Sequence, residues 1–273
     1  MLGIVAGASI LAAAFPAPRG AAQAIVSSGE SFVDARLLVG EPRDDGSRDA
    51  GLELRVEPGW KTYWRAPGEA GIPPRFDWSR SANLAGVEVG WPAPQVFESF
   101  GLQTVGYAGT VVLPLRLTPQ DPARPIDAVL DLALGVCRDI CVLEETELGA
   151  SIAPGAPGPA AMRIALARAA EPPAAEAAGI GPVSCRIAGT GEDRAFTATL
   201  GIGQTLADPF VVLEAPEETG WFHGTSAMAE GGTLEVSSTL TLASDDAWID
   251  RSALRMTVLD PALVADIQGC SAS

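Results

Sequence analysis

Two cysteines that lie close together offer the most reactive chemistry in this 273-residue chain. Cys137 and Cys141 are separated by three residues in DLALGVCRDICVLEETEL, after an alternating apolar run and before an acidic stretch. Such a pair can form a structural disulfide, contribute to a metal site, or exchange electrons as a reversible disulfide. A disulfide across so short a loop removes little entropy from the unfolded chain, and a bent backbone would strain it and ease its reduction. The spacing leaves the structural and the redox interpretations open.

The other two cysteines, Cys185 and Cys270, lie far apart in the second half of the chain. Four cysteines allow three pairings. A Cys185–Cys270 bond would close a long loop and remove considerable entropy from the unfolded chain, which favours a structural role. We therefore predict the disulfides Cys185–Cys270 and Cys137–Cys141.

The metal interpretation is disfavoured because the chain supplies few further ligands. Its single histidine, His223, lies in the second half, and Met162, Met228 and Met256 are scattered singly. A structural zinc site needs four Cys or His ligands, and a copper site of soft ligands needs clustered sulfur atoms. We predict no metal and no other cofactor. A serine hydrolase is unsupported because GTSAM, residues 224–228, lacks the nucleophile-elbow pattern.

Composition restricts the partners. Hydrophobic residues make up 47% of the chain, which is enough for a core that does not depend on metals or disulfides. The formal net charge of −16 argues against nucleic acid and anionic membrane surfaces as partners.

Residues 1–24 resemble a secretory signal peptide. The apolar stretch Leu2–Phe15 is too short to span a bilayer, and Ala22-Gln23-Ala24 matches a cleavage site. No basic residue precedes the apolar stretch, so an uncleaved anchor is the alternative. We expect cleavage after Ala24, a periplasmic location, and no stable membrane insertion of the mature protein. Disulfides persist in that oxidising compartment.

Period-two alternation of apolar and polar residues predicts many strands and few helices. In GLELRVEP, for example, Leu52, Leu54 and Val56 alternate with charged residues. Gly and Pro clusters separate the strands as turns. The predicted strands are 32–39, 51–58, 59–64, 87–91, 110–117, 126–136, 143–152, 194–200, 210–214, 233–242 and 253–259.

A segment rich in Ala, Pro and Gly interrupts the strands at residues 154–180, and this composition is typical of a linker. Its middle, Ala160–Ala170, is compatible with a short helix. The sequence therefore predicts an all-β protein with two β-sandwich domains, residues 25–153 and 181–273, joined by the linker 154–180.

Three segments are similar to a known family: GWKTYWRAPGEAGIPPRFDW, WPAPQVFESFGLQTVGYAGTVVLPL and GVCRDICVLEETEL. They resemble the N-terminal periplasmic domain of the thiol:disulfide interchange protein DsbD. The similarity is closer still to the amino-terminal region of the suppressor-of-copper-sensitivity proteins, and it covers roughly Phe32 to Ala153. The resemblance implies an immunoglobulin-like sandwich that carries a redox disulfide.

The resemblance also implies roles for the cysteines. Cys137 and Cys141 would be the exchanging pair, and Cys141, in the position of the family's second cysteine, would bond to partners. A membrane thiol carrier would supply electrons. Periplasmic thioredoxin-fold proteins would receive them, in disulfide repair, cytochrome c maturation or copper tolerance. The activity implied is that of a protein-disulfide reductase. The rival interpretation is a non-enzymatic β-sandwich binding module whose disulfides are both structural.

A shielding cap is implied as well. The family's acidic and aromatic cap loop corresponds to FESFG, which places Glu98 and Phe100 over the pair, while Tyr63 and Trp64 would flank it. One acidic residue of that loop is replaced here by Phe97, and the cysteine pair of DsbD is more widely spaced.

Overall fold

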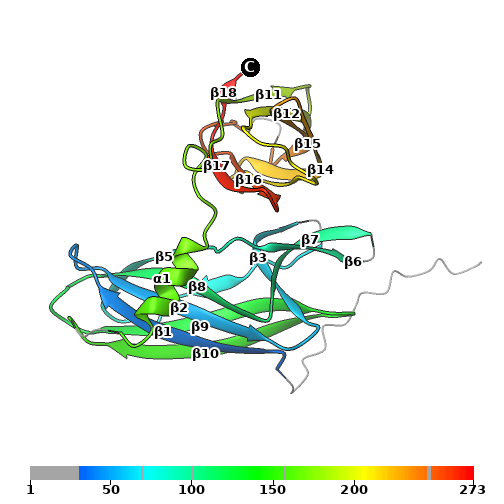
Figure 1. Cartoon of the computed structure of the whole chain (residues 1–273). Helices are drawn as coiled ribbons and strands as arrows, with labels where there is room; N and C mark the ends of the chain where they lie inside the picture. The colour runs from blue at the N-terminus through cyan, green and yellow to red at the C-terminus, as the bar shows by residue number, and fades with distance from the viewer. Residues whose placement is uncertain (1–30, 69, 100, 156–157, 245–246) are drawn as a thin grey trace, which may run out of the picture.

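A computed structural model describes residues 31–68, 70–99, 101–155, 158–244 and 247–273 (Figure 1). The predicted signal peptide, residues 1–24, lies outside the described residues. The named elements of the described residues are strands except for one short helix, and the all-β prediction is confirmed.

Two sheets form a first sandwich. The smaller sheet has the order β1-β2-β8-β5, and the larger has the order β10-β9-β3-β7-β6 with β4 paired to β9. Their bounds are β1 Val33–Pro42, β2 Arg48–Val56, β3 Lys61–Gly68, β4 Arg75–Asp77, β5 Leu84–Val89, β6 Gln95–Ser99, β7 Leu102–Ala108, β8 Thr110–Pro119, β9 Ile126–Cys137 and β10 Cys141–Ile152.

Strand alternation builds the core of this sandwich. Along β9, Leu130, Leu132 and Leu134 are at most 2% exposed, while the residues between them are only half-buried. Leu52 on β2 and Leu115 on β8 meet these leucines from the smaller sheet. Side chains on a strand alternate between its two faces. The leucines at every second position therefore face the core, and the residues between them face away from it.

A second sandwich follows, with sheet orders β14-β15-β12-β11-β18 and β13-β16-β17. Phe196 on β12, Val236 on β15 and Val258 on β16 share its core. Its strands are β11 Val183–Ala188, β12 Asp193–Gly201, β13 Phe210–Glu214, β14 Gly220–Glu230, β15 Thr233–Leu242, β16 Arg255–Asp260, β17 Leu263–Gln268 and β18 Ser271–Ala272.

The segment between the sandwiches is partly packed. Its helix α1, Ala161–Ala169, contacts β1, β2 and β8. Ile164 is buried where Gly40 and Gly51 make room for it, since a Cβ at either glycine would approach Ile164 to 2.9 or 3.1 Å. Arg163 pairs with the buried carboxylate of Glu53. The first part of the predicted linker is therefore anchored to the first sandwich. The domain boundaries 25–153 and 181–273 stay a prediction.

Within the described residues, no helix combines the length and the apolar character needed to cross a membrane. The same residues contain no group of three or more His, Cys, Asp or Glu side chains placed to hold a metal ion.

Candidate functional site

The Cys137–Cys141 disulfide closes the tip of the β9–β10 hairpin. β9 ends at Cys137 and β10 begins at Cys141, and the antiparallel register places the two residues directly opposite each other. The backbone N–H of Arg138 donates to the carbonyl of Ile140 at 3.0 Å and closes the turn between them. The second predicted disulfide, Cys185–Cys270, is also present.

The two cysteines of the hairpin differ in access. Cys137 is 2% exposed, whereas Cys141 is exposed. The difference is consistent with the sequence, because Cys137 ends an apolar strand and Cys141 follows the charged residues Arg138 and Asp139. A partner molecule in solution therefore reaches Cys141 first.

Tyr63 on β3 contacts the buried sulfur. Its hydroxyl donates a hydrogen bond to Cys137 Sγ at 2.8 Å and lies 3.6 Å from Cys141 Sγ. Burial raises the pKa of Tyr63, so the phenol remains a protonated donor while thiols ionise. A hydrogen bond stabilises a thiolate more than a disulfide sulfur, because the negative charge strengthens it. The contact therefore favours Cys137 as a leaving thiolate.

Two glycines make room for the Tyr63 ring. A Cβ at Gly135 on β9 would lie 3.1 Å from Tyr63 Cδ2, and a Cβ at Gly71 would lie 2.8 Å from Tyr63 Cδ1. Glycine in or beside a strand often marks such a close approach. The ring is held between β9 and the loop that follows β3, and its hydroxyl is directed at the disulfide.

Lys61 also lies near the pair and contacts Phe97, although neither was predicted as a site residue. Lys61 stands opposite Cys137 in the β3–β9 register, so their side chains share a face of the sheet. Lys61 Nζ donates to Thr104 Oγ1 at 3.0 Å and lies 5.1 Å from the centre of the Phe97 ring. Burial lowers the pKa of Lys61. Phe97 thus brings an aromatic ring of the β6–β7 hairpin to this face. The sequence signal for Lys61 is its position two residues before Tyr63, because residues two apart on a strand share a face.

The other predicted cap residues have different positions. Trp64 is fully buried in the core and adjoins Tyr63 in β3, which places the two side chains on opposite faces. Of these two residues, Tyr63 is the one whose side chain contacts the sulfur atoms. Glu98 is exposed on β6 and, as the neighbour of Phe97, points to the opposite face of the hairpin. Phe100 lies outside the described residues.

Apolar side chains are exposed beside the disulfide. Ile140, in the turn between the cysteines, is 63% exposed, and Leu143 is 36% exposed. Leu143 pairs with Gly135, and Ile72 is so close to Gly135 that a Cβ there would lie 2.7 Å from Ile72 Cβ. We call Ile72, Ile140 and Leu143 the apolar rim. Exposed apolar groups gathered around a reactive atom are typical of a contact surface.

Comparison with known proteins gives related matches. Residues 34–151 match the family described as the N-terminal domain of thiol:disulfide interchange protein DsbD. The crystal structure of the N-terminal periplasmic domain of ScsB from Proteus mirabilis is similar, with a TM-score of 0.70 and 26% sequence identity. That similarity covers 91% of this chain and 96% of the other. No curated protein sequence matches the chain.

Proposed function

We propose that this protein carries electrons between proteins through Cys137 and Cys141, because residues 34–151 match the family of the DsbD N-terminal domain. In this proposal a membrane thiol carrier reduces the disulfide in the periplasm. The reduced pair then reduces thioredoxin-fold proteins that serve disulfide repair, cytochrome c maturation or copper tolerance.

One observation carries the proposal: the disulfide pairs an exposed sulfur with a buried one that accepts a hydrogen bond. Cys141 is exposed, and Cys137 is buried against the Tyr63 hydroxyl. Exchange requires an accessible sulfur for attack and a stabilised sulfur as leaving group. A purely structural disulfide requires neither.

Reduction follows from this asymmetry. A thiolate of the upstream carrier attacks Cys141 Sγ, and the bond to Cys137 breaks with its electron pair on Cys137 Sγ. A second thiolate of the carrier attacks the carrier sulfur of this mixed disulfide and releases Cys141 as a thiolate. The carrier ends as a disulfide, and Cys137 and Cys141 have gained two electrons, with protons taken from solvent.

Delivery runs the same steps in reverse order. The Cys141 thiolate attacks the disulfide of the thioredoxin-fold partner and forms a mixed disulfide. The Cys137 thiolate, accepting the Tyr63 hydrogen bond, then attacks Cys141 Sγ and releases the reduced partner. The site returns to its oxidised form.

A redox titration tests the proposal directly. We expect the Cys137–Cys141 pair to be reduced by a thioredoxin-type dithiol and across a glutathione series, while Cys185–Cys270 stays oxidised. Cys185 is 1% exposed in a core, so attack is blocked, and its disulfide closes a separation of 85 residues, so reduction would remove the loop constraint that stabilises this sandwich. Alkylation of free thiols followed by peptide mass spectrometry measures both pairs. Equal reduction of the two would favour the binding-module interpretation.

The apolar rim provides a second test. Ile140→Ser is expected to slow exchange with a thioredoxin-fold protein several-fold, because about 1–2 kcal/mol of apolar contact is lost on docking. Exchange with the small reagent dithiothreitol should be unchanged, since that reagent does not bury the rim. Leu166→Ser is the matched control, because Leu166 on α1 is also 63% exposed. A rim that is irrelevant to docking would give equal rates for Ile140→Ser and Leu166→Ser.

A further inference from the structure

The strand that carries Tyr63 leaves its regular pairing directly after this residue. Tyr63 pairs with Gly106 of β7, and the next pair in register is Gly68 with Thr104. Residues 64–67 of β3 therefore lie opposite a single residue of β7, Val105. Such an irregularity bends a strand and weakens the hold of the ladder on it. Other contacts must hold β3 beyond Tyr63.

Arg65, within this irregular stretch, is fastened to the second sandwich. Its guanidinium donates to both carboxylate oxygens of Glu214 at 3.1 and 3.0 Å, and to Thr257 Oγ1 at 3.2 Å. Asp266 Oδ1 is 3.7 Å from Arg65 Nη2. These partners come from β13, β16 and β17, so one side chain contacts every strand of that sheet. Its own side chain is 11% exposed, and bidentate pairs of this kind fix orientation.

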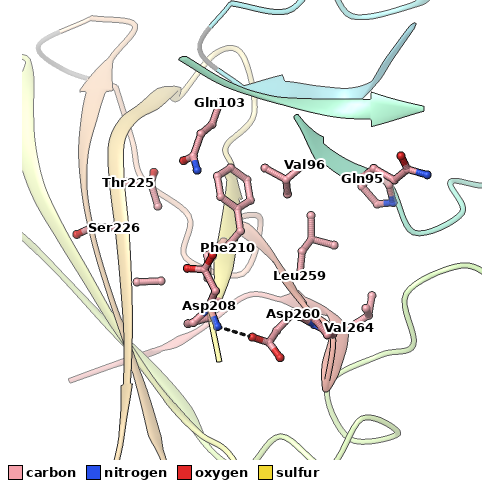
Figure 2. Close-up of a pocket in the computed structure, with 15 residues that line it drawn as sticks. Gln95, Val96, Gln103, Asp208, Phe210, Thr225, Ser226, Leu259, Asp260 and Val264 are labelled. Atoms are coloured by element: carbon pink, nitrogen blue, oxygen red, sulfur yellow. Dashed lines mark hydrogen bonds between the residues drawn. The ribbon is translucent and has the colours of Figure 1, made fainter. Parts of the chain in front are cut away.

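Apolar side chains make further contacts between the sandwiches, and Phe210 and Val264 of the second sandwich pack against the core of the first. Val212 and Leu259 of the second sandwich join the core of the first. Beside them a cavity of about 600 Å³ separates the β6–β7 hairpin from the second sandwich. Figure 2 shows the ring of Phe210 pointing into this cavity, toward Val96 and Gln103 of the hairpin. The second sandwich therefore meets β3 closely at Arg65 and leaves open space beside the hairpin.

Gly71 links the irregular stretch to the Tyr63 ring, because it lies close to both Pro67 and the ring. A Cβ at Gly71 would lie 2.2 Å from Pro67 Cβ and 2.8 Å from Tyr63 Cδ1. Pro67 ends the irregular stretch two residues after Arg65, and Gly71 then lies against the ring. A displacement at Arg65 would thus be passed to the ring through Pro67 and Gly71.

We propose that Arg65 is a positioning residue through which the second sandwich holds the Tyr63 hydroxyl against Cys137 Sγ and so sets how readily the Cys137–Cys141 disulfide is reduced. This inference rests on the proposed function. It assigns the second sandwich a role in the redox site, although the hydrogen bonds to the two sulfur atoms among the described residues come from Tyr63 of the first sandwich.

The test is the equilibrium between this pair and glutathione, measured in the full chain. Arg65→Met is expected to make the pair about fivefold harder to reduce, the equivalent of losing one hydrogen bond to the Cys137 thiolate. Arg65→Lys keeps the charge without the bidentate contact and should give a smaller shift in the same direction. Arg43→Met is the control, because Arg43 forms its ion pair within the first sandwich, with Asp49 of β2. It should leave the equilibrium unchanged.

A double-mutant cycle separates positioning from a general structural effect. In a Tyr63→Phe background the hydroxyl is gone, so Arg65→Met should shift the equilibrium no further. An equal shift in both backgrounds, or no shift in either, overturns the inference. If Arg65→Met does not fold, Glu214→Gln replaces it in the same cycle. A wild-type pair that no dithiol reduces would instead overturn the proposed function.

Discussion

Cys137→Ala is expected to accumulate a covalent complex with a thioredoxin-fold partner, joined through Cys141. Cys141 is the exposed member of the pair and forms the mixed disulfide. In the unmodified protein the Cys137 thiol breaks this mixed disulfide, because Cys137 stands directly opposite Cys141 in the register of the hairpin. Well-oriented intramolecular groups act at effective concentrations of about 10⁵ M or more, so the loss of Cys137 should make resolution the slow step. Most of the partner should be trapped.

Non-reducing electrophoresis and mass spectrometry of the linked peptide measure the adduct. Cys141→Ala serves as the matched variant and should trap none, since Cys137 is 2% exposed. The double variant Cys137→Ala with Cys141→Ala controls for adducts through the other cysteines. Adducts formed by Cys141→Ala alone would reverse the roles of the two sulfurs. Adducts from neither single variant would favour the binding module.

Removal of the Cys185–Cys270 disulfide should produce the largest loss of stability. The bond closes a separation of 85 residues, and the chain-entropy relation for a loop of that size corresponds to about 4–5 kcal/mol. The same relation gives only about 2 kcal/mol for Cys137–Cys141, whose separation is 4 residues. Cys185→Ala with Cys270→Ala should therefore destabilise the second sandwich far more than the equivalent double variant destabilises the first.

Hydrogen exchange resolved by peptide is the suitable measurement, because it reports the opening of each sandwich separately. Amides of β11 and β12 should lose most protection, since Cys185 lies on β11 and pairs with Ala198 of β12. Amides of β8 and β9 in the first sandwich provide the internal control. Equal loss of protection in both sandwiches, or a loss no larger than for the Cys137 and Cys141 double variant, would contradict this assignment.

Sequence reasoning was reliable where a local pattern decides the structure. The alternation in residues 126–136 predicted β9, and the strands 210–214 and 233–242 have the predicted bounds. Short strands with weaker alternation were not predicted, among them β6 and β7, which form the hairpin beside the disulfide. Their pairing comes from register with β3, which a local pattern does not contain.

The adjacent residues Tyr63 and Trp64 show the same limit within the site. Both were predicted to flank the disulfide, yet a strand sends neighbouring side chains to opposite faces. The structure places Tyr63 at Cys137 Sγ and Trp64 in the core. The sequence identified both aromatic residues, but the register of β3 with β9 decides which of them faces the sulfur.

The sequence by itself determined the all-β composition, the two disulfides and the difference in burial between Cys137 and Cys141. Each of these depends on residue type, on spacing along the chain, or on the end of an apolar run. Only the tertiary structure decided that Lys61 lies opposite Cys137 and contacts Phe97, and that Arg65 joins Glu214, 149 residues away. The physical reason is that strand register and sandwich packing bring distant residues together, whereas hydrophobic periodicity records which face of a strand is buried and not which partner covers it.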